Sequence, residues 1–473
     1  MTQSNGQSYI VIVTIWTPSL ADRSGPLYLA IADALAEDAR SGRLRPGTRL
    51  PTHRELADRL GVTVGTVTRG YAEAARRGVV AGEVGRGSFV RGPAADFLSP
   101  ALREADEGLV ELGLNLPPPL GEGKGGVLSR TLQALAQQDL SALLDYPSDG
   151  AARGHREAGA AWLARAGLKA DPERVLVSSG SQHALTVVFA AFLRPGDVLL
   201  TEALTYPGVK GVAGLLNLRL VGVPLDAHGL LPDAFEAACR AHAPRALYLI
   251  PTIHNPTTVV LGEARRREIA RVARAHNVVV VEDDVHRLLA EEAPAPIASL
   301  LPELSCFLLG TSKTLAPGLR IGFIYAPAPL VPRIAAGIRA TTWMAAPLMA
   351  EIFARWERDG TALKLLKRRR DEARARQRLA AELLEGFNLQ AHPSSHHAWL
   401  HLPEPWRGET FEAEARRSGV AVTPAQAFQV GRASAPHAVR LGLGAPRTRE
   451  ELRTGLERVA AALARTAETP MLV

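Results

Sequence analysis

Cysteine is scarce in this 473-residue chain, which contains only Cys239 and Cys306. The two residues lie far apart and lack the spacing of metal ligands, which argues against a disulfide framework or a zinc site and fits a reducing cytoplasm. Long apolar runs are also missing. The N-terminal stretch YIVIVTIW lacks the basic start of a signal peptide and is far too short to span a bilayer. We therefore expect a soluble cytoplasmic protein without a metal site or a membrane partner.

Strong charge of either sign is lacking as well. Apolar residues make up 47% of the chain and charged residues 22%, an ordinary globular balance. The 55 basic and 48 acidic residues leave a net charge of +7, a mild excess that still allows basic patches to meet nucleic acid or phosphate. The length predicts two or three domains.

The first ninety residues have the pattern of short helices. Leu27, Ile31, Ala34 and Leu35 recur at helical spacing, and the Pro46-Gly47 pair stops that helix. Without further signals, the simplest interpretation of such a segment is a small helical domain with one face exposed to solvent.

A helix-turn-helix is predicted next. Thr52 precedes HRELADRLG as an N-cap should, and Glu55 follows three residues later. Gly61 ends this short helix, and Thr63 or Thr66 can start the following one. The β-rich stretch GVVAGEVGRGSFVRG then predicts a two-stranded wing.

Residues 21–92 contain 12 arginines, 8 acids and no lysine. The strings PLY, GRLRPGTRLPTHRELADRLGV, TVTRGY and GRGSFV occur in an order that resembles the winged helix-turn-helix of the GntR family. Val64 stands where many members carry arginine, so base specificity does not carry over. The resemblance implies five DNA contacts, which suit phosphates and guanine edges: Arg49, Arg54, Thr63, Thr66 and Arg69.

From about residue 150 onward, helical stretches alternate with short β-branched runs. This order predicts an α/β fold with a mostly parallel sheet covered on both faces, and ligands in such sheets bind beyond the carboxyl ends of the strands. The informative residues each follow a predicted strand: Ser181, Tyr206, Asn255, Asp283 and Lys313.

These residues have the chemistry that pyridoxal 5'-phosphate requires. Lys313 has hydroxyl neighbours and the nearby Arg320, which suit a phosphate, and an adjacent arginine lowers the pKa of a lysine and favours a Schiff base. Asp283 can pair with a pyridinium nitrogen, Tyr206 can stack on the ring, and Asn255 can donate to its phenolic oxygen. The stretch SSGSQHAL starts a helix after a glycine turn, which predicts an anion site.

Each element has a simpler explanation by itself: a solvated lysine, a turn or a helix cap. Their joint order is specific. The chain after residue 110 resembles a fold type I aminotransferase, a PLP-dependent transferase with a smaller α+β C-terminal domain, and its fusion to a GntR-like head resembles the MocR type of bacterial transcriptional regulators.

The resemblance implies a role for each matching residue. It implies that Lys313, Asp283 and Tyr206 are the catalytic residues. It also implies that Arg440 in HAVRLGLG binds a substrate carboxylate, because the planar guanidinium group can donate two parallel hydrogen bonds to it. Asn115, in the loop after the entry strand LVELGLNLPPP, is a second candidate substrate contact. The further cofactor contacts are Asn255, Ser181, Gln182, Ser312, Arg320 and His286.

The chain departs from the family at several positions. His286 stands where aminotransferases commonly place a tyrosine, and imidazole has a pKa near neutrality. Gly310 stands where a phosphate-binding serine is frequent, and Thr311 or Ser312 can compensate. The basic stretch KLLKRRRDEARARQR favours an amphipathic helix of the smaller domain over a second DNA contact. For His396 and His397, packing or hydrogen bonding is the better hypothesis than a metal site; Ser394 and Ser395 replace the more usual glycines.

We expect an arm (1–22), a winged helix-turn-helix (23–92), a linker (93–112) and an aminotransferase-like domain (113–473) with a large part near 150–330 and a small part near 335–473. The favoured function is a homodimeric regulator that binds operator DNA and senses an amine or pyridoxal phosphate. The alternatives are a working aminotransferase with a head domain and a scaffold that has lost its cofactor.

Overall fold

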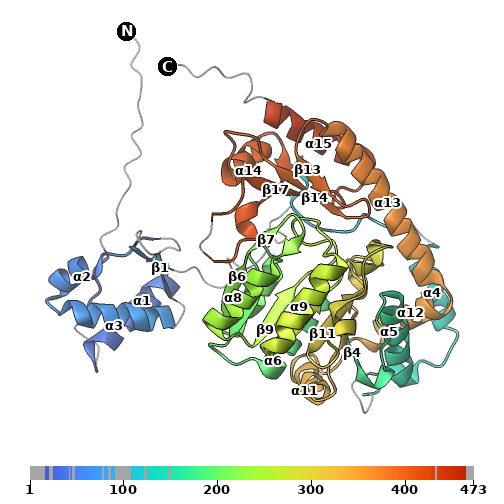
Figure 1. Ribbon diagram of the computed structural model, residues 1–473, viewed down its shortest axis with the longest axis horizontal. Coiled ribbons are helices and arrows are strands. Elements are labelled where there is room, and N and C mark those ends of the chain that lie inside the picture. The colour runs from blue at the N-terminus through green and yellow to red at the C-terminus, as the bar shows by residue number, and fades with distance from the viewer. Residues whose placement is uncertain are drawn as a thin grey trace, which may run out of the picture. The chain divides into compact units, whose positions relative to one another are not determined.

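The computed structural model describes residues 16–20, 25–41, 43–44, 48–76, 79–83, 87–90, 108–121, 125–146, 151–431 and 434–464. It divides into two compact units, residues 1–98 and 99–473 (Figure 1). The first fifteen residues of the expected arm and most of the expected linker lie outside the described residues.

The smaller N-terminal unit, here called the head, has the expected helix-turn-helix and hairpin. The capping box at Thr52 and Glu55 is present, and Gly61 ends the second helix in the left-handed conformation at φ 65°. The tip of the hairpin and the Pro46-Gly47 pair lie outside the described residues. The elements are α1 (Leu27–Arg40), α2 (His53–Leu60), α3 (Val64–Arg76), β1 (Val80–Glu83) and the antiparallel β2 (Gly87–Val90).

The core of the head explains why these helices form. Ile31 and Leu35 of α1 pack with Val67 and Tyr71 of α3, all of them buried, as the helical spacing predicts. Trp16 joins this core and donates its indole N–H to Asp38 at 2.7 Å. The end of the expected arm therefore packs as part of the head, because an indole ring is stabilised by burial with a partner for its N–H.

A seven-stranded sheet forms the centre of the larger unit, in the order β4-β12-β11-β10-β9-β5-β6 (Figure 1). All neighbours are parallel except β12, which runs antiparallel to both β11 and β4. The mostly parallel sheet is thus confirmed, and β12 is the element that the pattern of alternation did not predict. The strands are β4 (Val175–Ser178), β5 (Val198–Glu202), β6 (Arg219–Val223), β9 (Ala246–Leu249), β10 (Val279–Asp283), β11 (Ser305–Gly310) and β12 (Gly322–Tyr325).

Helices cover both faces of this sheet. One face packs on α6, α7 and α11, and the other on α5 and α12 at one end and on α8, α9 and α10 at the other. Burial on both faces explains why the strands read as continuous apolar runs. The helices are α5 (Arg153–Arg165), α6 (Ser181–Phe192), α7 (Pro207–Leu215), α8 (Pro232–His242), α9 (Glu263–Ala275), α10 (Ile297–Leu300), α11 (Val331–Thr341) and α12 (Pro347–Arg358).

The C-terminal part of this unit has its own core and an antiparallel sheet in the order β13-β14-β17-β16. Two expected boundaries move. The short strand β3 pairs with β15, so residues 110–112 belong here rather than to a linker, and α11 and α12 pack on the larger part. The elements are β3 (Val110–Glu111), α13 (Thr361–Leu383), β13 (Leu389–Ala391), β14 (His397–His401), α14 (Gly408–Arg417), β15 (Val420–Ala421), β16 (Thr423–Pro424), β17 (Ala438–Gly442) and α15 (Arg449–Ala464).

Several short elements complete the larger unit. They are α4 (Val127–Leu135), the hairpin of β7 (Leu225–Asp226) and β8 (Gly229–Leu230), and the single-turn helices Ser141–Leu143, Pro172–Arg174, Arg287–Leu289, Pro317–Leu319 and Ala425–Ala427.

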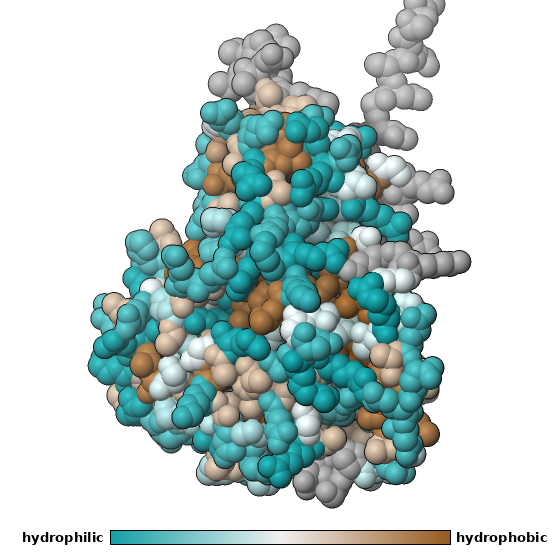
Figure 2. Space-filling model, turned by 90° about the vertical axis from the view of Figure 1, so that its right-hand side faces the viewer, coloured by the Kyte–Doolittle hydropathy of each residue, from teal (hydrophilic) through white to brown (hydrophobic). Residues whose placement is uncertain are grey.

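The basic stretch predicted as an amphipathic helix is α13, with Leu365, Leu366 and Ala373 buried. Figure 2 views the side of α4, α12 and α13 and shows small apolar patches among hydrophilic side chains. Among the described residues, no helix is long and apolar enough to cross a membrane.

Candidate functional site

The predicted site residues gather at one edge of the large sheet. Asp283 ends β10, Lys313 follows β11, and Asn255 follows β9. Ser181 begins α6 directly after β4, and Tyr206 is the residue before α7. The parallel strands bring their carboxyl ends to this edge, which is where an α/β sheet binds ligands.

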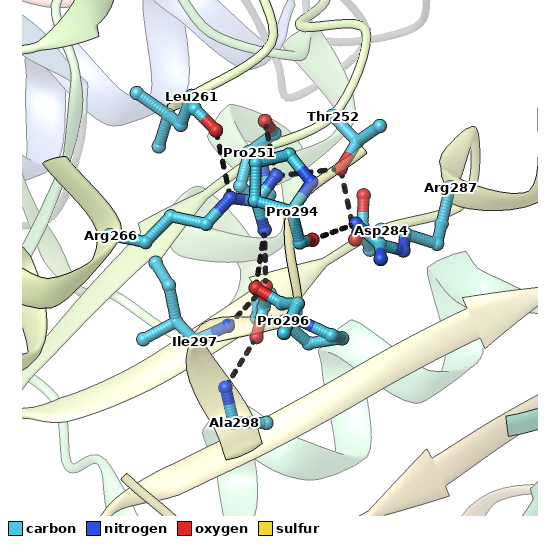
Figure 3. A network of polar contacts seen from close by, with 12 residues as sticks. Pro251, Thr252, Leu261, Arg266, Asp284, Arg287, Pro294, Pro296, Ile297 and Ala298 are labelled. Atoms are coloured by element: carbon cyan, nitrogen blue, oxygen red, sulfur yellow. Dashed lines mark hydrogen bonds and ion pairs between the residues drawn. The ribbon is translucent and has the colours of Figure 1, made fainter. Parts of the chain in front are cut away.

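Three acids stand at the end of strand β10: Glu282 and Asp283 are its last two residues, and Asp284 follows it. Glu282 and Asp284 form hydrogen bonds with other parts of the protein. Glu282 accepts hydrogen bonds from the backbone N–H groups of Ile297 (3.0 Å) and Ala298 (2.8 Å) and pairs with Arg266 at 3.4 Å (Figure 3). Asp284 accepts from the Thr252 hydroxyl at 3.1 Å. Both carboxylates are buried, and Asp284 Oδ1, like Asp283 Oδ1, has no hydrogen-bond partner in the described part of the chain.

Buried arginines supply the positive charge for this cluster. Arg266 is fully buried and also donates to the backbone oxygens of Leu261 (2.9 Å) and Pro251 (3.0 Å). Burial raises the pKa of Glu282 to about 7, and Arg266 opposes that rise. Burial also raises the pKa of Asp284, and Arg266 and Arg287 oppose that rise. The cluster therefore explains two of the three acids as structural.

Asp283 differs from its two neighbours in the cations near it: arginines favour the charged forms of Glu282 and Asp284, whereas Lys313 is the cation that favours the charged form of Asp283. Its Oδ2 accepts the Tyr248 hydroxyl at 2.8 Å, whereas its Oδ1 is buried and has no hydrogen-bond partner in the described part of the chain. Burial raises the pKa of this carboxyl to about 7, against the hydrogen bond from Tyr248. The unpartnered Oδ1 of Asp283 is available to a polar ligand at this edge of the sheet, since an unsatisfied buried acceptor is costly.

Lys313 is half-buried, and its ammonium donates to the backbone oxygen of Asn115. Burial lowers the pKa of this lysine to about 8, and the second cause is Arg440. Sequence reasoning attributed such a shift to Arg320, and this was wrong, because the guanidinium that acts on the amine comes from a distant strand. His396 donates from Nε2 to the Lys313 carbonyl at 2.8 Å, so it holds the loop of the lysine.

Arg440 projects from β17 into the same pocket. It donates to Asn255 Oδ1 at 2.9 Å and to the backbone oxygen of Gly113, and its guanidinium lies 4.8 Å from the centre of the Phe428 ring. The bond to Oδ1 leaves the amide N–H groups of Asn255 as the donors toward a ligand. Both terminal nitrogens of the predicted carboxylate fork thus have protein partners in this structure, and Nε is buried without one in the part described.

The N-terminus of α6 forms a cradle with Arg320. The guanidinium lies over Gly180, where a Cβ would sit 2.6 Å from Nη2, and it donates to Ser312 Oγ at 3.4 Å. Arg320 itself has φ 52°, an uncommon left-handed conformation that indicates a functional constraint. A Cβ on Gly310 would collide with Ser181 Oγ, so the Ser181 hydroxyl fills the space beside this glycine. The missing serine at 310 is explained by that contact.

Gln182 and Tyr206 contact each other at the edge of this cradle. The Tyr206 hydroxyl donates to Gln182 Oε1 at 3.2 Å, and the Gln182 amide donates to the Gly208 oxygen at 3.1 Å. Burial and the charge of Asp283 raise the pKa of Tyr206 above its ordinary value, so the phenol stays neutral.

His286 is buried, and both of its ring nitrogens lack a partner among the described residues. Burial holds its pKa well below the ordinary value, so the expected titration near neutrality was wrong and the ring is neutral at physiological pH. Its ring centre lies 5.7 Å from that of His397, which donates to the His254 oxygen at 3.1 Å. His396 and His397 are thus hydrogen-bonding residues, as predicted, and they hold the loops of Lys313 and Asn255.

Pyridoxal 5'-phosphate fits the chemistry of this pocket. The buried polar atoms without a partner in the described chain include Asn115 Oδ1 and Nδ2, Asp283 Oδ1, both nitrogens of His286 and Arg440 Nε, all of which belong to predicted site residues. A carboxylate for a ring nitrogen, an amine of lowered pKa and a helix N-terminus beside an arginine match the three polar regions of that cofactor.

The predicted DNA contacts lie on the head. Arg49, Arg54, Thr63 and Arg69 are exposed, and Thr66 is half-buried. The two threonine hydroxyls lie 2.9 Å apart, and Thr63 Oγ caps α3 by accepting the Thr66 N–H at 3.2 Å. Sequence reasoning did not single out Tyr248, whose hydroxyl donates to Asp283 at 2.8 Å. Its place in a predicted strand was the available signal, and only the structure shows that this strand lies beside β10.

Comparison with known proteins agrees with both units. Residues 108–459 match the aminotransferase class I and II family, and residues 27–90 match the gntR family of bacterial regulatory proteins. This chain belongs to the aminotransferase class I and II family. With its gntR-type head it is a DNA-binding regulator of the MocR type with a domain for pyridoxal phosphate, which is the cofactor of that family.

Two transcriptional regulators match this chain over most of their length. The chain is 31% identical over 444 residues to the uncharacterized HTH-type transcriptional regulator YdeF of Bacillus subtilis, which covers 93% of this chain and 95% of the relative. It is 27% identical over 445 residues to the HTH-type transcriptional regulator TauR of Rhodobacter capsulatus, covering 85% and 90%. The kynurenine aminotransferase of Pyrococcus horikoshii has the same fold, with a TM-score of 0.72, 23% identity and coverage of 80% and 96%.

Proposed function

We propose that this regulator senses an amino compound, or pyridoxal phosphate itself, in its aminotransferase-like domain and adjusts the binding of its head to operator DNA. The observation that carries the proposal is the set of unpartnered buried polar atoms on Asn115, Asp283, His286 and Arg440 around the Lys313 amine. These atoms require a ligand with complementary polar groups, since leaving each unsatisfied costs about 1–3 kcal/mol.

The residues divide into three groups according to the part of the cofactor that they would hold. Ser181, Gln182, Ser312 and Arg320 surround the N-terminus of α6 for the phosphate, Asp283 and Asn255 face the ring, and Lys313 supplies the amine for covalent attachment. When bound, pyridoxal phosphate supplies an electrophilic carbonyl carbon and an electron sink. A pKa of about 8 keeps a useful fraction of the Lys313 amine unprotonated near neutral pH.

An incoming amine with a carboxylate would use the other side of the pocket. Arg440 and Asn115 are the residues for that carboxylate, and Arg440 must then exchange its contacts to Asn255 and Gly113. Because Arg440 lies on β17, such an exchange would displace the C-terminal sheet relative to the loop of Asn255. This is the kind of small shift that a packed interface amplifies.

We also propose a homodimer in the cytoplasm, where two heads meet a repeated half-site. The support is an exposed apolar group on the larger unit. Leu144 is 86% exposed, and the rings of Tyr146 and Trp343 touch at 5.3 Å while 72% and 54% exposed. Large apolar side chains gathered at a surface mark an interface. Sedimentation of wild type and of Tyr146→Ser tests this proposal, which predicts a dimer that the substitution weakens.

The proposed sensing is tested by one titration with two readouts. Purified protein receives pyridoxal phosphate and then a panel of amines, while visible absorbance and binding to its own upstream DNA are followed together. We expect absorbance and DNA affinity to change over the same range of ligand concentration. DNA binding that is insensitive to every addition would refute sensing, although cofactor binding would stand.

A working aminotransferase is the second candidate, and the lowered pKa of Lys313 beside an open Asp283 oxygen favours it. Turnover of amino acids at ordinary enzyme rates, without affinity for upstream DNA, would decide for this candidate. Protein that stays colourless after addition of the cofactor would support a scaffold without either activity.

A further inference from the structure

Tyr248 is a buried tyrosine behind the pocket that none of the predicted roles includes. It lies on β9, where it is the register partner of Val281 on β10. Side chains two residues apart on a strand share a face, so Asp283 lies on the same face as Val281 and diagonally beside Tyr248. This register lets the phenol reach the carboxylate, and its hydroxyl donates to Asp283 Oδ2 at 2.8 Å.

The packing of Tyr248 fixes this hydrogen bond. The ring is fully buried in the core under α6 and meets Phe189 edge to face, with centres 6.3 Å apart. Burial and the neighbouring Asp283 raise the pKa of the phenol well above its ordinary value, so the hydroxyl keeps its proton at every physiological pH. Its one proton is directed to Asp283.

The surroundings of Asp283 otherwise oppose a negative charge. Burial, Asp284 and Glu202 all favour the neutral acid, whereas Tyr248 and the more distant charge of Lys313 favour the carboxylate. In the described part of the chain, no arginine or lysine forms an ion pair with Asp283. Glu282, in contrast, forms an ion pair with Arg266. Tyr248 is therefore the direct hydrogen-bond donor that supports the charged form.

We propose that Tyr248 is a positioning residue for the cofactor: its hydroxyl fixes the rotation of the Asp283 carboxylate, stabilises the charged form and leaves Oδ1 as the oxygen that meets the ring nitrogen. This inference rests on the proposed pairing of Asp283 with pyridoxal phosphate. The carboxylate has one oxygen bonded and one buried without a partner, which is the arrangement that the role requires.

Tyr248→Phe tests the role because it removes one oxygen and keeps the ring. The first readout is the pKa of Asp283 in the cofactor-free protein, from carbon NMR of labelled aspartate with Asp283→Asn as the assignment reference. We expect this pKa to rise by about one unit or more in Tyr248→Phe, since a hydrogen bond to a charged group is lost. Tyr325→Phe is the matched control, a buried tyrosine on β12 of the same sheet, and it should leave the pKa unchanged.

The second readout is the dissociation constant of pyridoxal phosphate in a double-mutant cycle. We expect Tyr248→Phe to weaken binding about tenfold or more in the wild-type background and to have no further effect beside Asp283→Asn. Equal weakening in both backgrounds, or an unchanged Asp283 pKa, would overturn the positioning role. If Asp283→Asn itself leaves the affinity unchanged, the pairing with the cofactor fails instead.

A further variant keeps the proposal testable if Tyr248→Phe fails to fold. Placing 3-fluorotyrosine at position 248 makes the phenol a stronger donor while retaining the ring and the hydroxyl. We expect the Asp283 pKa to move in the opposite direction, downward, and an unchanged value would also overturn the proposal.

Discussion

The head and the pocket present their candidate residues in opposite ways. On the head, Arg49, Arg54 and Arg69 are exposed to water, and the DNA contacts predicted for them depend on charge that salt screens. At the edge of the large sheet, Asp283 is buried and Lys313 half-buried, and desolvation moves their pKa values to about 7 and about 8. Surface charge therefore serves long-range binding to a polyanion, whereas desolvation prepares reactive groups for one ligand.

The largest effect is expected from Lys313→Ala, which should abolish cofactor attachment in the larger unit and leave DNA binding by the head intact. Lys313→Ala removes the amine for covalent attachment, so we expect complete loss of the visible absorbance that pyridoxal phosphate induces. Binding to nonspecific DNA should persist, because the head retains its arginines. Lys364→Ala, an exposed lysine on α13, is the control and should keep the absorbance.

The pH dependence of stability tests the burial of Asp283. Its folded pKa of about 7 lies above the ordinary 3.8, so below about pH 4 it has no effect on stability, and its cost grows as pH rises toward 7. Asp283→Asn should remove this cost. We expect the difference in unfolding free energy, variant minus wild type, to rise with pH across that window by up to about 1.4 kcal/mol per unit. Urea unfolding of the cofactor-free protein measures it, and a difference that does not vary with pH would contradict the burial.

A smaller loss is expected from His396→Ala, which leaves the Lys313 carbonyl without the donor that directly precedes strand β14 of the C-terminal sheet. An unsatisfied buried carbonyl costs about 1–3 kcal/mol, so both the free energy of unfolding and the affinity for pyridoxal phosphate should fall. His401→Ala, at the half-exposed end of β14, is the control. If the two variants behave alike, the C-terminal sheet does not hold the lysine loop.

Arg54→Ala should affect only the head. We expect affinity for operator DNA to fall several-fold and the slope of log affinity against log salt to decrease by about one, as for loss of one phosphate contact. The cofactor absorbance should not change. Arg267→Ala, exposed on α9 of the larger unit, provides the comparison. Equal losses from both variants would mean that the larger unit shares the DNA contact.

The smallest effect is expected from His286→Tyr. The variant should still bind pyridoxal phosphate, because the other contacts remain, while the pH dependence of the bound cofactor's spectrum shifts as a hydroxyl replaces a neutral imidazole. A titration identical to that of wild type would show that His286 does not touch the cofactor.

The local pattern of the sequence was sufficient to predict many of the helices and strands and to select the candidate site residues. Thr52, Glu55 and Gly61 predicted the ends of α2 because capping depends on neighbours in sequence. The alternation of apolar runs and helices predicted the mostly parallel sheet, and the place of Lys313 and Asp283 after strands followed from it. The insertion of antiparallel β12 between β4 and β11 was not predictable in this way, because pairing partners are remote in sequence.

By itself, the sequence determined the kinds of residue in the pocket and their order along the chain, since these follow from local spacing. The tertiary structure decided which groups act on each other. It brought Arg440 beside Lys313, placed Glu282 and Asp284 in structural contacts, and paired Asp283 with the Tyr248 hydroxyl. The physical reason is burial. Solvent exclusion and contacts between distant segments set the charge of each group, and neither is encoded in local spacing.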